Sequence, residues 1–176
     1  MPRPPSRGAR FGTRFHLWVE QHFGPGLPSG SLGQQQLIDP DDLSDRADSG
    51  TQDEAELREL CAAFIAGQFG GTVPYAIEAP FAMAVAGRLI RGRIDAVYSG
   101  FPDRPRFTRF QVVDWKTNRS ETADPLQLAI YRLAWAEAHQ VPVAEVDAVF
   151  YYVRSDRVVR PDKLPARAEL ERLLGG

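Results

Sequence analysis

The chain has 176 residues, of which 43% are hydrophobic and 25% charged, so it can form one globular domain with its own core. Its net charge of −2 is not that of a strongly basic nucleic-acid-binding protein. The single cysteine, Cys61, excludes a four-cysteine iron–sulfur cluster in this chain, and the lack of a G-x-x-x-x-G-K-[ST] segment excludes a P-loop ATP site.

The first third of the sequence predicts two helices separated by a long connection. Residues 1–11 are rich in Pro and Arg and predict a linker, so we expect the folded domain to span residues 12–176. Residues 13–23 place apolar side chains at helical spacing, with Thr13 as the N-cap and Gly24-Pro25 as the stop. Residues 24–50, rich in Gly, Pro, Ser, Gln and Asp, predict a flexible loop, and residues 53–68 predict the second helix.

The rest of the chain changes to strand signals with one strong helix among them. Residues 73–85 and 88–99 predict two strands joined by a hairpin at Ala86-Gly87, and residues 106–117 predict a third. Asp124 and Pro125 begin a helix over residues 124–140. Residues 145–160 predict a fourth strand, with Ser155-Asp156 as a candidate turn, and residues 166–176 a final helix. This order predicts an α/β fold with a central mixed sheet of four to five strands flanked by helices.

Charge is distributed unevenly along the chain. An acidic block occupies residues 39–59, whereas arginines cluster at residues 88–93, 104–109 and 154–172. The chain can therefore present a basic face, although two solvated surfaces of opposite sign are the simpler interpretation. No apolar run approaches the ~18 residues of a membrane span, and the start lacks the apolar core of a signal peptide, so we expect a cytoplasmic protein with no membrane partner.

Two strands carry acids in otherwise apolar segments. In QVVDWKTNRS, residues 111–120, Asp114 and Lys116 are two apart and therefore point to one face of a strand, with Trp115 on the other. Asp95 interrupts the preceding strand in GRIDAV. If the strands are neighbours, the two carboxylates repel each other unless a cation such as Mg²⁺ or Mn²⁺ lies between them. A lysine beside that cation suits phosphodiester hydrolysis, because it neutralises charge on the phosphate and can orient or deprotonate water.

Other interpretations of these residues are available. Asp95 and Asp114 can each form an ordinary surface ion pair with an arginine, and a lone D-x-K favours that interpretation. In QLAIY, Gln127 and Tyr131 are four apart and share a helix face, which suits contact with nucleic acid or support of the acids. A packed tyrosine beside an exposed glutamine is equally common.

Four motifs in order resemble those of RecB-family nucleases in the PD-(D/E)XK superfamily. That family shows a G-[ST]-x-x-H helix, a G-x-x-D strand, a D-[YW]-K-[TS] strand and a Q-x-x-x-Y helix. The chain has GTRFH at 12–16, GRIDAV at 92–97, VVDWKTN at 112–118 and QLAIY at 127–131. The resemblance covers most of the chain, from about Gly12 to Val153, and it implies the restriction-endonuclease-like α/β fold.

The resemblance implies a role for each matching residue. His16, Asp95 and Asp114 would ligate the metal, with the carbonyl of Trp115 as a further ligand. Asp95, Asp114 and Lys116 would form the catalytic set, with Lys116 as the catalytic lysine. Without the family, His16 is more simply a packed helix histidine.

Three further residues are implied in support. Gln127 and Tyr131 would assist DNA binding and site geometry, and Glu78, in IEAPF, matches an acidic position of the preceding strand. His22 and His139 are expected to be surface residues.

The motif sequences are similar to those of C-terminal nuclease domains in UvrD/PcrA-like and AdnAB-type bacterial helicase–nucleases. The missing cysteines indicate the branch without an iron–sulfur cluster, and the missing P-loop agrees with a motor that lies upstream. This resemblance implies a Mg²⁺- or Mn²⁺-dependent deoxyribonuclease, with exonuclease activity expected. We expect its substrate to be single-stranded DNA, which a helicase motor of the same polypeptide or complex would deliver. The expected setting is double-strand-break repair and recombination at the bacterial nucleoid.

Two other functions are open to the same sequence. A nuclease-fold domain can act as a catalytically inactive DNA-binding scaffold, although Asp95, Asp114 and Lys116 are all retained here. A small metal-dependent enzyme that acts on another phosphate ester is the third possibility, and failure to bind DNA would favour it.

Overall fold

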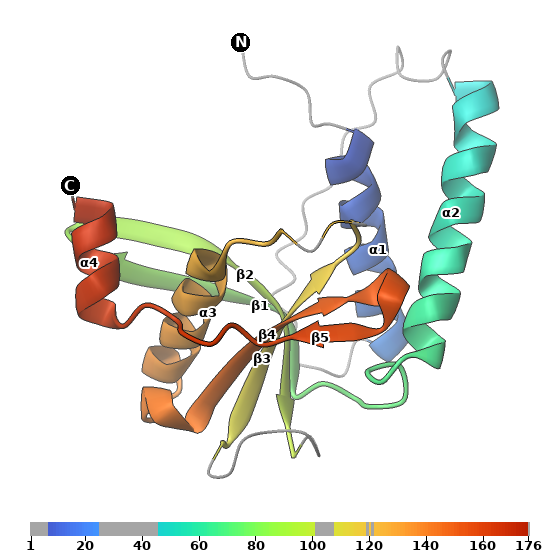
Figure 1. Cartoon of the computed structure of the whole chain (residues 1–176). Helices are drawn as coiled ribbons and strands as arrows, with labels where there is room; N and C mark the ends of the chain where they lie inside the picture. The colour runs from blue at the N-terminus through green and yellow to red at the C-terminus, as the bar shows by residue number, and fades with distance from the viewer. Residues whose placement is uncertain (1–6, 25–45, 101–107, 119, 121, 176) are drawn as a thin grey trace.

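Five strands form one mixed sheet in the order β1-β2-β3-β4-β5 (Figure 1). The structure is a computed structural model that describes residues 7–24, 46–100, 108–118, 120 and 122–175, without the side chains of residues 7–10 and 46–51. The strands are β1 (Ala76–Val85), β2 (Arg88–Ser99), β3 (Phe110–Lys116), β4 (Val146–Tyr152) and β5 (Arg157–Val159). The predicted α/β class with a mixed sheet of four to five strands is confirmed.

Only one strand pair in the sheet is parallel. Strands β1 and β2 form an antiparallel hairpin, and its two loop residues Ala86 and Gly87 have φ of 49° and 72°, the positive values that a tight hairpin turn requires. Strands β2 and β3 are also antiparallel. Strands β3 and β4 run parallel and are connected through helix α3 (Pro125–Ala138), since parallel neighbours need a crossover. The carboxyl end of β3 therefore lies beside the start of α3.

Two pairs of helices cover the two faces of the sheet (Figure 1). Helices α1 (Arg7–Phe23) and α2 (Arg46–Ala66) pack on one face, where Phe15 and Phe64 contact the ring of Trp115. Helix α3 covers the other face with Leu128 and Trp135, and α4 (Arg167–Gly175) lies next to it. Burying an aromatic side chain of this kind contributes about 1.5–3 kcal/mol, so these contacts fix where α1 and α3 present their polar residues. None of the described helices is long and apolar enough to cross a bilayer.

The first two helices begin earlier than the sequence predicts. Helix α1 starts at Arg7, so Thr13 is an interior residue and not the N-cap, and residues 7–11 are helical although they were expected in the linker. Arg and Ala favour helix, and Phe11 packs against the core beneath the guanidinium of Arg154, which extends the helix toward the N-terminus. Helix α2 starts at Arg46, since a helix anchored by packing propagates at low cost. The remainder of the predicted linker and loop, residues 1–6 and 25–45, lies outside the described residues.

The second half of the chain follows the prediction closely. Asp124 caps α3 as expected, because its Oδ1 accepts a hydrogen bond from the backbone N–H of Leu126 at 2.9 Å. The segment at 145–160 divides into β4 and β5 at the predicted turn, where Asp156 has φ of 48°. His22 and His139 are exposed, as predicted.

Candidate metal and active site

In the β1–β2 hairpin, the face to which side chains point changes at Glu78 and Asp95, which lie between the paired residues Ile77–Ala96 and Ala79–Ile94. The flanking residue pairs pack against opposite helix layers: Ile77–Ala96 beneath α1 and α2, and Ala79–Ile94 beneath α3. Glu78 has φ of 46°, a left-handed value that is uncommon and strained for a residue with a side chain. Two acids close together on neighbouring strands repel each other without a cation. The left-handed backbone of Glu78 and this repulsion therefore both destabilise the hairpin.

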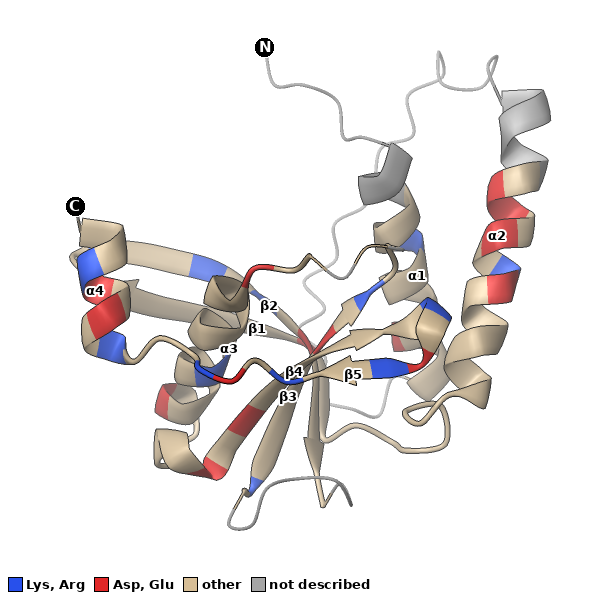
Figure 2. Cartoon of the chain, in the orientation of Figure 1, with Lys and Arg blue, Asp and Glu red and all other residues tan. Residues whose placement is uncertain are grey.

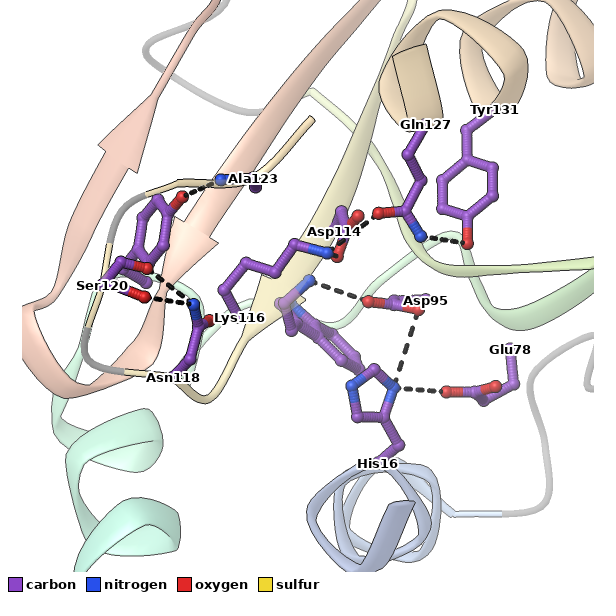
Figure 3. A network of polar contacts seen from close by, with 12 residues as sticks. His16, Glu78, Asp95, Asp114, Lys116, Asn118, Ser120, Ala123, Gln127 and Tyr131 are labelled. Carbon is purple, nitrogen blue, oxygen red and sulfur yellow. Dashed lines mark hydrogen bonds and ion pairs between the residues drawn. The ribbon is translucent and has the colours of Figure 1, made fainter. Parts of the chain in front are cut away.

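His16 of helix α1 lies beside these two acids. His16 Nδ1 lies 2.9 Å from Glu78 Oε1 and 3.6 Å from Asp95 Oδ1 (Figure 3). The three residues offer ligand atoms that all lie within 4.8 Å of one another. His16 reaches them because its neighbours on α1, Phe15 and Val19, are fully buried against the sheet.

The end of β3 adds a third acid and a lysine. The backbone N–H of Trp115 donates to Asp95 Oδ2 at 2.8 Å, which ties β2 to β3 at the level of the acids. Asp114 Oδ1 lies 2.9 Å from Lys116 Nζ, while Asp114 Oδ2 is buried and has no hydrogen-bond partner among the described residues. Asp114 and Lys116 share one face of β3, and Trp115 points to the opposite face among the aromatic residues of α1 and α2, as the strand periodicity predicts.

Helix α3 connects to the lysine through a chain of hydrogen bonds (Figure 3). Lys116 Nζ donates to Gln127 Oε1 at 2.9 Å, and Gln127 Nε2 donates to the hydroxyl of Tyr131 at 3.0 Å. The i,i+4 spacing places Gln127 and Tyr131 on the same helix face, as the sequence predicts. The glutamine amide thus holds Lys116 at a fixed position beside Asp114.

The arrangement shifts the pKa values of its acids and its histidine. Burial acts to lower the pKa of His16, but the hydrogen bond with Glu78 and the charges of Asp95, Glu78 and Asp114 raise it to about 9. Burial, supported by the charges of Asp114 and Glu78 and opposed by His16, raises the pKa of Asp95 to about 8. Burial also raises the pKa of Asp114, although Lys116 opposes that shift. Without a cation, the site therefore retains protons that free side chains would have lost.

The donor set fits a hard divalent cation. Carboxylate oxygens with one imidazole nitrogen are ligands for Mg²⁺ or Mn²⁺, and at least two carboxylates are close enough to repel each other. The unpartnered Asp114 Oδ2 supplies a further free oxygen. A buried carboxylate oxygen at this place is available to a bound cation.

The eight residues predicted for the site lie together, but the role of one of them changes. The group that can hold an ion consists of His16, Glu78 and Asp95, whereas Glu78 was predicted only in support. An acid within the apolar segment IEAPF was the available signal. Trp115 contributes its backbone N–H to Asp95, and its predicted role as a carbonyl ligand stays a prediction.

Arg154 is a residue near the site that the sequence did not single out. Its Nε donates to the carbonyl of Thr117 at 2.9 Å, and its guanidinium pairs with Glu56 of α2 at 2.6 Å. It thereby fixes the segment that follows Lys116 against the α1–α2 layer. A single arginine in a strand-end segment carries no distinguishing sequence signal.

Charged residues are mixed on α4 but gather by sign on α2 and on part of β2 (Figure 2). Acidic residues line the described part of α2, and Arg88, Arg91 and Arg93 are exposed along β2. These three arginines form no ion pair with any residue that the structure describes. Asp95 follows these arginines on the same strand, β2, so their positive charge lies near the site.

One family of known proteins matches nearly the whole chain. The model of the PD-(D/E)XK nuclease superfamily matches residues 2–174, a range that includes every residue of the site. Comparison with curated proteins gave no match.

Proposed function

Because the chain belongs to the PD-(D/E)XK nuclease superfamily, whose members are typically metal-dependent nucleases, we propose that it is a Mg²⁺- or Mn²⁺-dependent deoxyribonuclease of the RecB-like branch. The observation that carries this proposal is the convergence of three acids, a histidine and a lysine at the level where β1 and β2 change facing. An ordinary ion-pair network would match its charges, whereas this group has a surplus of carboxylates.

We assign the metal to His16, Glu78 and Asp95, with Asp114 and the Trp115 carbonyl as ligands from β3. When bound, the ion supplies Lewis acidity for phosphodiester hydrolysis and positive charge beside the phosphate. The chain supplies the placement, because the Trp115 N–H holds one oxygen of Asp95 and leaves the other directed toward His16.

Lys116 is the catalytic lysine in this proposal. Its ammonium group lies against Asp114 and is oriented by the amide of Gln127, so it faces the place where a phosphate would meet the acids. There the ammonium group neutralises the charge that grows on the phosphate oxygens and orients the attacking water. Gln127 and Tyr131 are positioning residues that act through Lys116.

The substrate and the setting follow from the motif resemblance and from the basic strand. Arg88, Arg91 and Arg93 suit contact with a phosphate backbone, which would make binding salt-dependent and independent of sequence. We propose single-stranded DNA as the substrate and exonuclease action as the mode. The motor would be a helicase in the same polypeptide or complex, and the setting double-strand-break repair and recombination.

The test is cleavage of labelled single-stranded DNA by the purified protein with Mn²⁺ or Mg²⁺. We expect cutting by the wild type and none by Asp114→Ala, because that variant loses a buried acid of the site. Asp162→Ala, which removes an exposed acid outside the site, is the matched control and should cut normally.

Calorimetric titration with Mn²⁺ separates the proposed nuclease from its alternatives. A protein that binds DNA but neither binds the ion nor cuts is an inactive scaffold, and binding of the ion without binding of DNA would favour an enzyme for another phosphate ester. Cutting by Asp114→Ala at the wild-type rate would contradict the assigned mechanism.

A further inference from the structure

A cavity of about 300 Å³ opens between the β1–β2 hairpin and the first half of α3. Its apolar walls come from Phe81 and Ile90 on the hairpin and from Leu126 and Ile130 on the helix. This volume is at the lower end of roughly 300–1,000 Å³ for ligand pockets, so it fits one small ring system and not a double helix.

The cavity shares two of its residues with the candidate active site. Gln127 and Tyr131 line it, and the same Gln127 accepts the hydrogen bond from Lys116 at 2.9 Å. On the hairpin, Phe81 follows Glu78 by three residues along β1. A group held in the cavity would therefore be a close neighbour of a phosphate at the acids and Lys116.

The walls suit a flat aromatic group. The rings of Phe81 and Tyr131 lie edge to face, with centroids 5.6 Å apart and planes at 71°. Phe81 also lies directly over Gly92, where an added Cβ would come within 2.8 Å of the ring. The missing side chain at Gly92 is what lets the Phe81 ring lie at the wall of the cavity.

The polar atoms at the cavity offer little for reading a sequence. The amide of Gln127 is already bonded to Lys116 and Tyr131, and Asp124 Oδ1 already caps α3. Arg91, which also lines the cavity, is exposed and forms no ion pair within the described part of the chain. The combination is an apolar cavity with one basic side chain, Arg91, and one acidic side chain, Asp124, at its border.

We propose that this cavity receives one unpaired nucleobase of the DNA strand being cut, while Arg91 contacts the phosphate backbone that leads to the site. The inference rests on the proposed function, because it takes DNA as the substrate. Aromatic and apolar walls bind any base by stacking, and a base in a duplex is already stacked and paired, so it must leave the helix to enter. The cavity thus gives a physical reason for single-strand specificity without sequence specificity.

Abasic scanning tests the proposal on the wild-type protein. A set of single-stranded oligonucleotides carries one abasic site each, at successive positions, and the cutting rate at each phosphodiester is measured. We expect one fixed position relative to the cut bond at which the missing base slows cutting by about 5- to 150-fold, the range for loss of one base–aromatic stack. Equal rates at all positions in a protein that cuts would overturn the cavity proposal and leave the proposed function intact.

Filling the cavity tests the same proposal from the protein side. Ile130→Trp places a large side chain in the cavity, and Ile65→Trp on exposed α2 is the matched control. We expect Ile130→Trp to cut slowly and to lose the positional effect of the abasic site, while Ile65→Trp keeps both. If Ile130→Trp does not fold by circular dichroism, Phe81→Leu, which removes a stacking ring, takes its place.

A binding readout covers a protein that does not cut. Oligonucleotides with 2-aminopurine at successive positions are titrated with protein in the absence of metal. One position whose fluorescence changes with the wild type and Ile65→Trp, but not with Ile130→Trp, supports the cavity even if the cleavage function fails. Binding with no position-specific change, or no binding at all, contradicts it.

Discussion

The chain contains two polar clusters, one with an exposed acid and one with buried acids, that treat their acids in opposite ways. In the Asp156 cluster, formed by Gln68, Tyr151 and Asp156, the carboxylate accepts the backbone N–H of Gln68 at 3.0 Å and the hydroxyl of Tyr151 at 2.7 Å. In the candidate site, three acids share one histidine and one lysine, and one oxygen of Asp114 has no partner among the described residues. The first cluster has donors for its acid, and the second has too few.

The pKa shifts express the same contrast. Burial acts to raise the pKa of Asp156, but the hydrogen bonds from Gln68 and Tyr151 lower it below its ordinary value. Burial raises the pKa of Asp95 to about 8, despite the opposing charge of His16. The exposed Asp156 is stabilised in its charged form by two donors and by solvent, whereas the buried acids of the site need a cation from outside.

The largest expected effect is the loss of cutting on Lys116→Ala. Lys116 is the side-chain cation that neutralises charge on the substrate beside the metal ion, so we expect the cutting rate to fall at least about 10²–10³-fold, the usual cost of removing one stabilising donor. Single-turnover cleavage with Mn²⁺ measures it. Lys163→Ala removes an exposed lysine and should have no effect, and a Lys116→Ala protein with the wild-type rate would make the site no different from the Asp156 cluster.

The affinity for Mn²⁺ should rise with pH. In the metal-free protein His16 and Asp95 have pKa values of about 9 and about 8, so both retain protons at neutral pH that the ion must displace. Each displaced proton makes binding about tenfold tighter per pH unit until the pH exceeds the pKa. Calorimetry at pH 6, 7 and 8 in buffers of different ionisation enthalpy measures both the affinity and the released protons. Binding that releases no proton would show that the ion does not use these ligands.

Gln127→Ala should have an intermediate effect. The variant removes the acceptor that holds Lys116 and the donor to Tyr131, but it leaves every acid in place. We expect cutting to slow by about 10–100-fold, as for other groups that orient a reacting residue. The affinity for Mn²⁺ should stay unchanged, which separates a positioning role from a ligand role. A parallel loss of metal affinity would contradict the assignment.

Much of the fold and part of the site follow from local signals in the sequence. The hairpin at Ala86-Gly87, the cap at Asp124 and the shared face of Asp114 and Lys116 depend on turn chemistry, capping and strand periodicity. All three act over a few residues, so one sequence is enough to predict them.

The remainder depends on contacts between distant segments. The distance between His16 and Glu78 is set by how α1 packs on the sheet, and the positive φ of Glu78 is maintained by the surrounding hairpin. Neither this distance nor this φ value can be predicted from neighbouring residues, which is why Glu78 was predicted only as a supporting residue. The same holds for the start of α1, because packing of Phe11 lengthens a helix that its Pro-rich surroundings argue against.

The smallest expected effects come from a matched pair of variants, Tyr151→Phe and Tyr131→Phe, each of which removes one hydroxyl from one cluster. Tyr151→Phe keeps the ring contact with Phe69 but removes a donor to Asp156, so it should lower the free energy of unfolding by about 0.5–1.5 kcal/mol in urea and leave cutting unchanged. Tyr131→Phe removes the acceptor for Gln127 at the edge of the site, so it should slow cutting in addition to a loss of stability no larger than that of Tyr151→Phe. If both variants lower stability and neither changes the cutting rate, the candidate site is a second structural cluster, and its additional acids have no catalytic role.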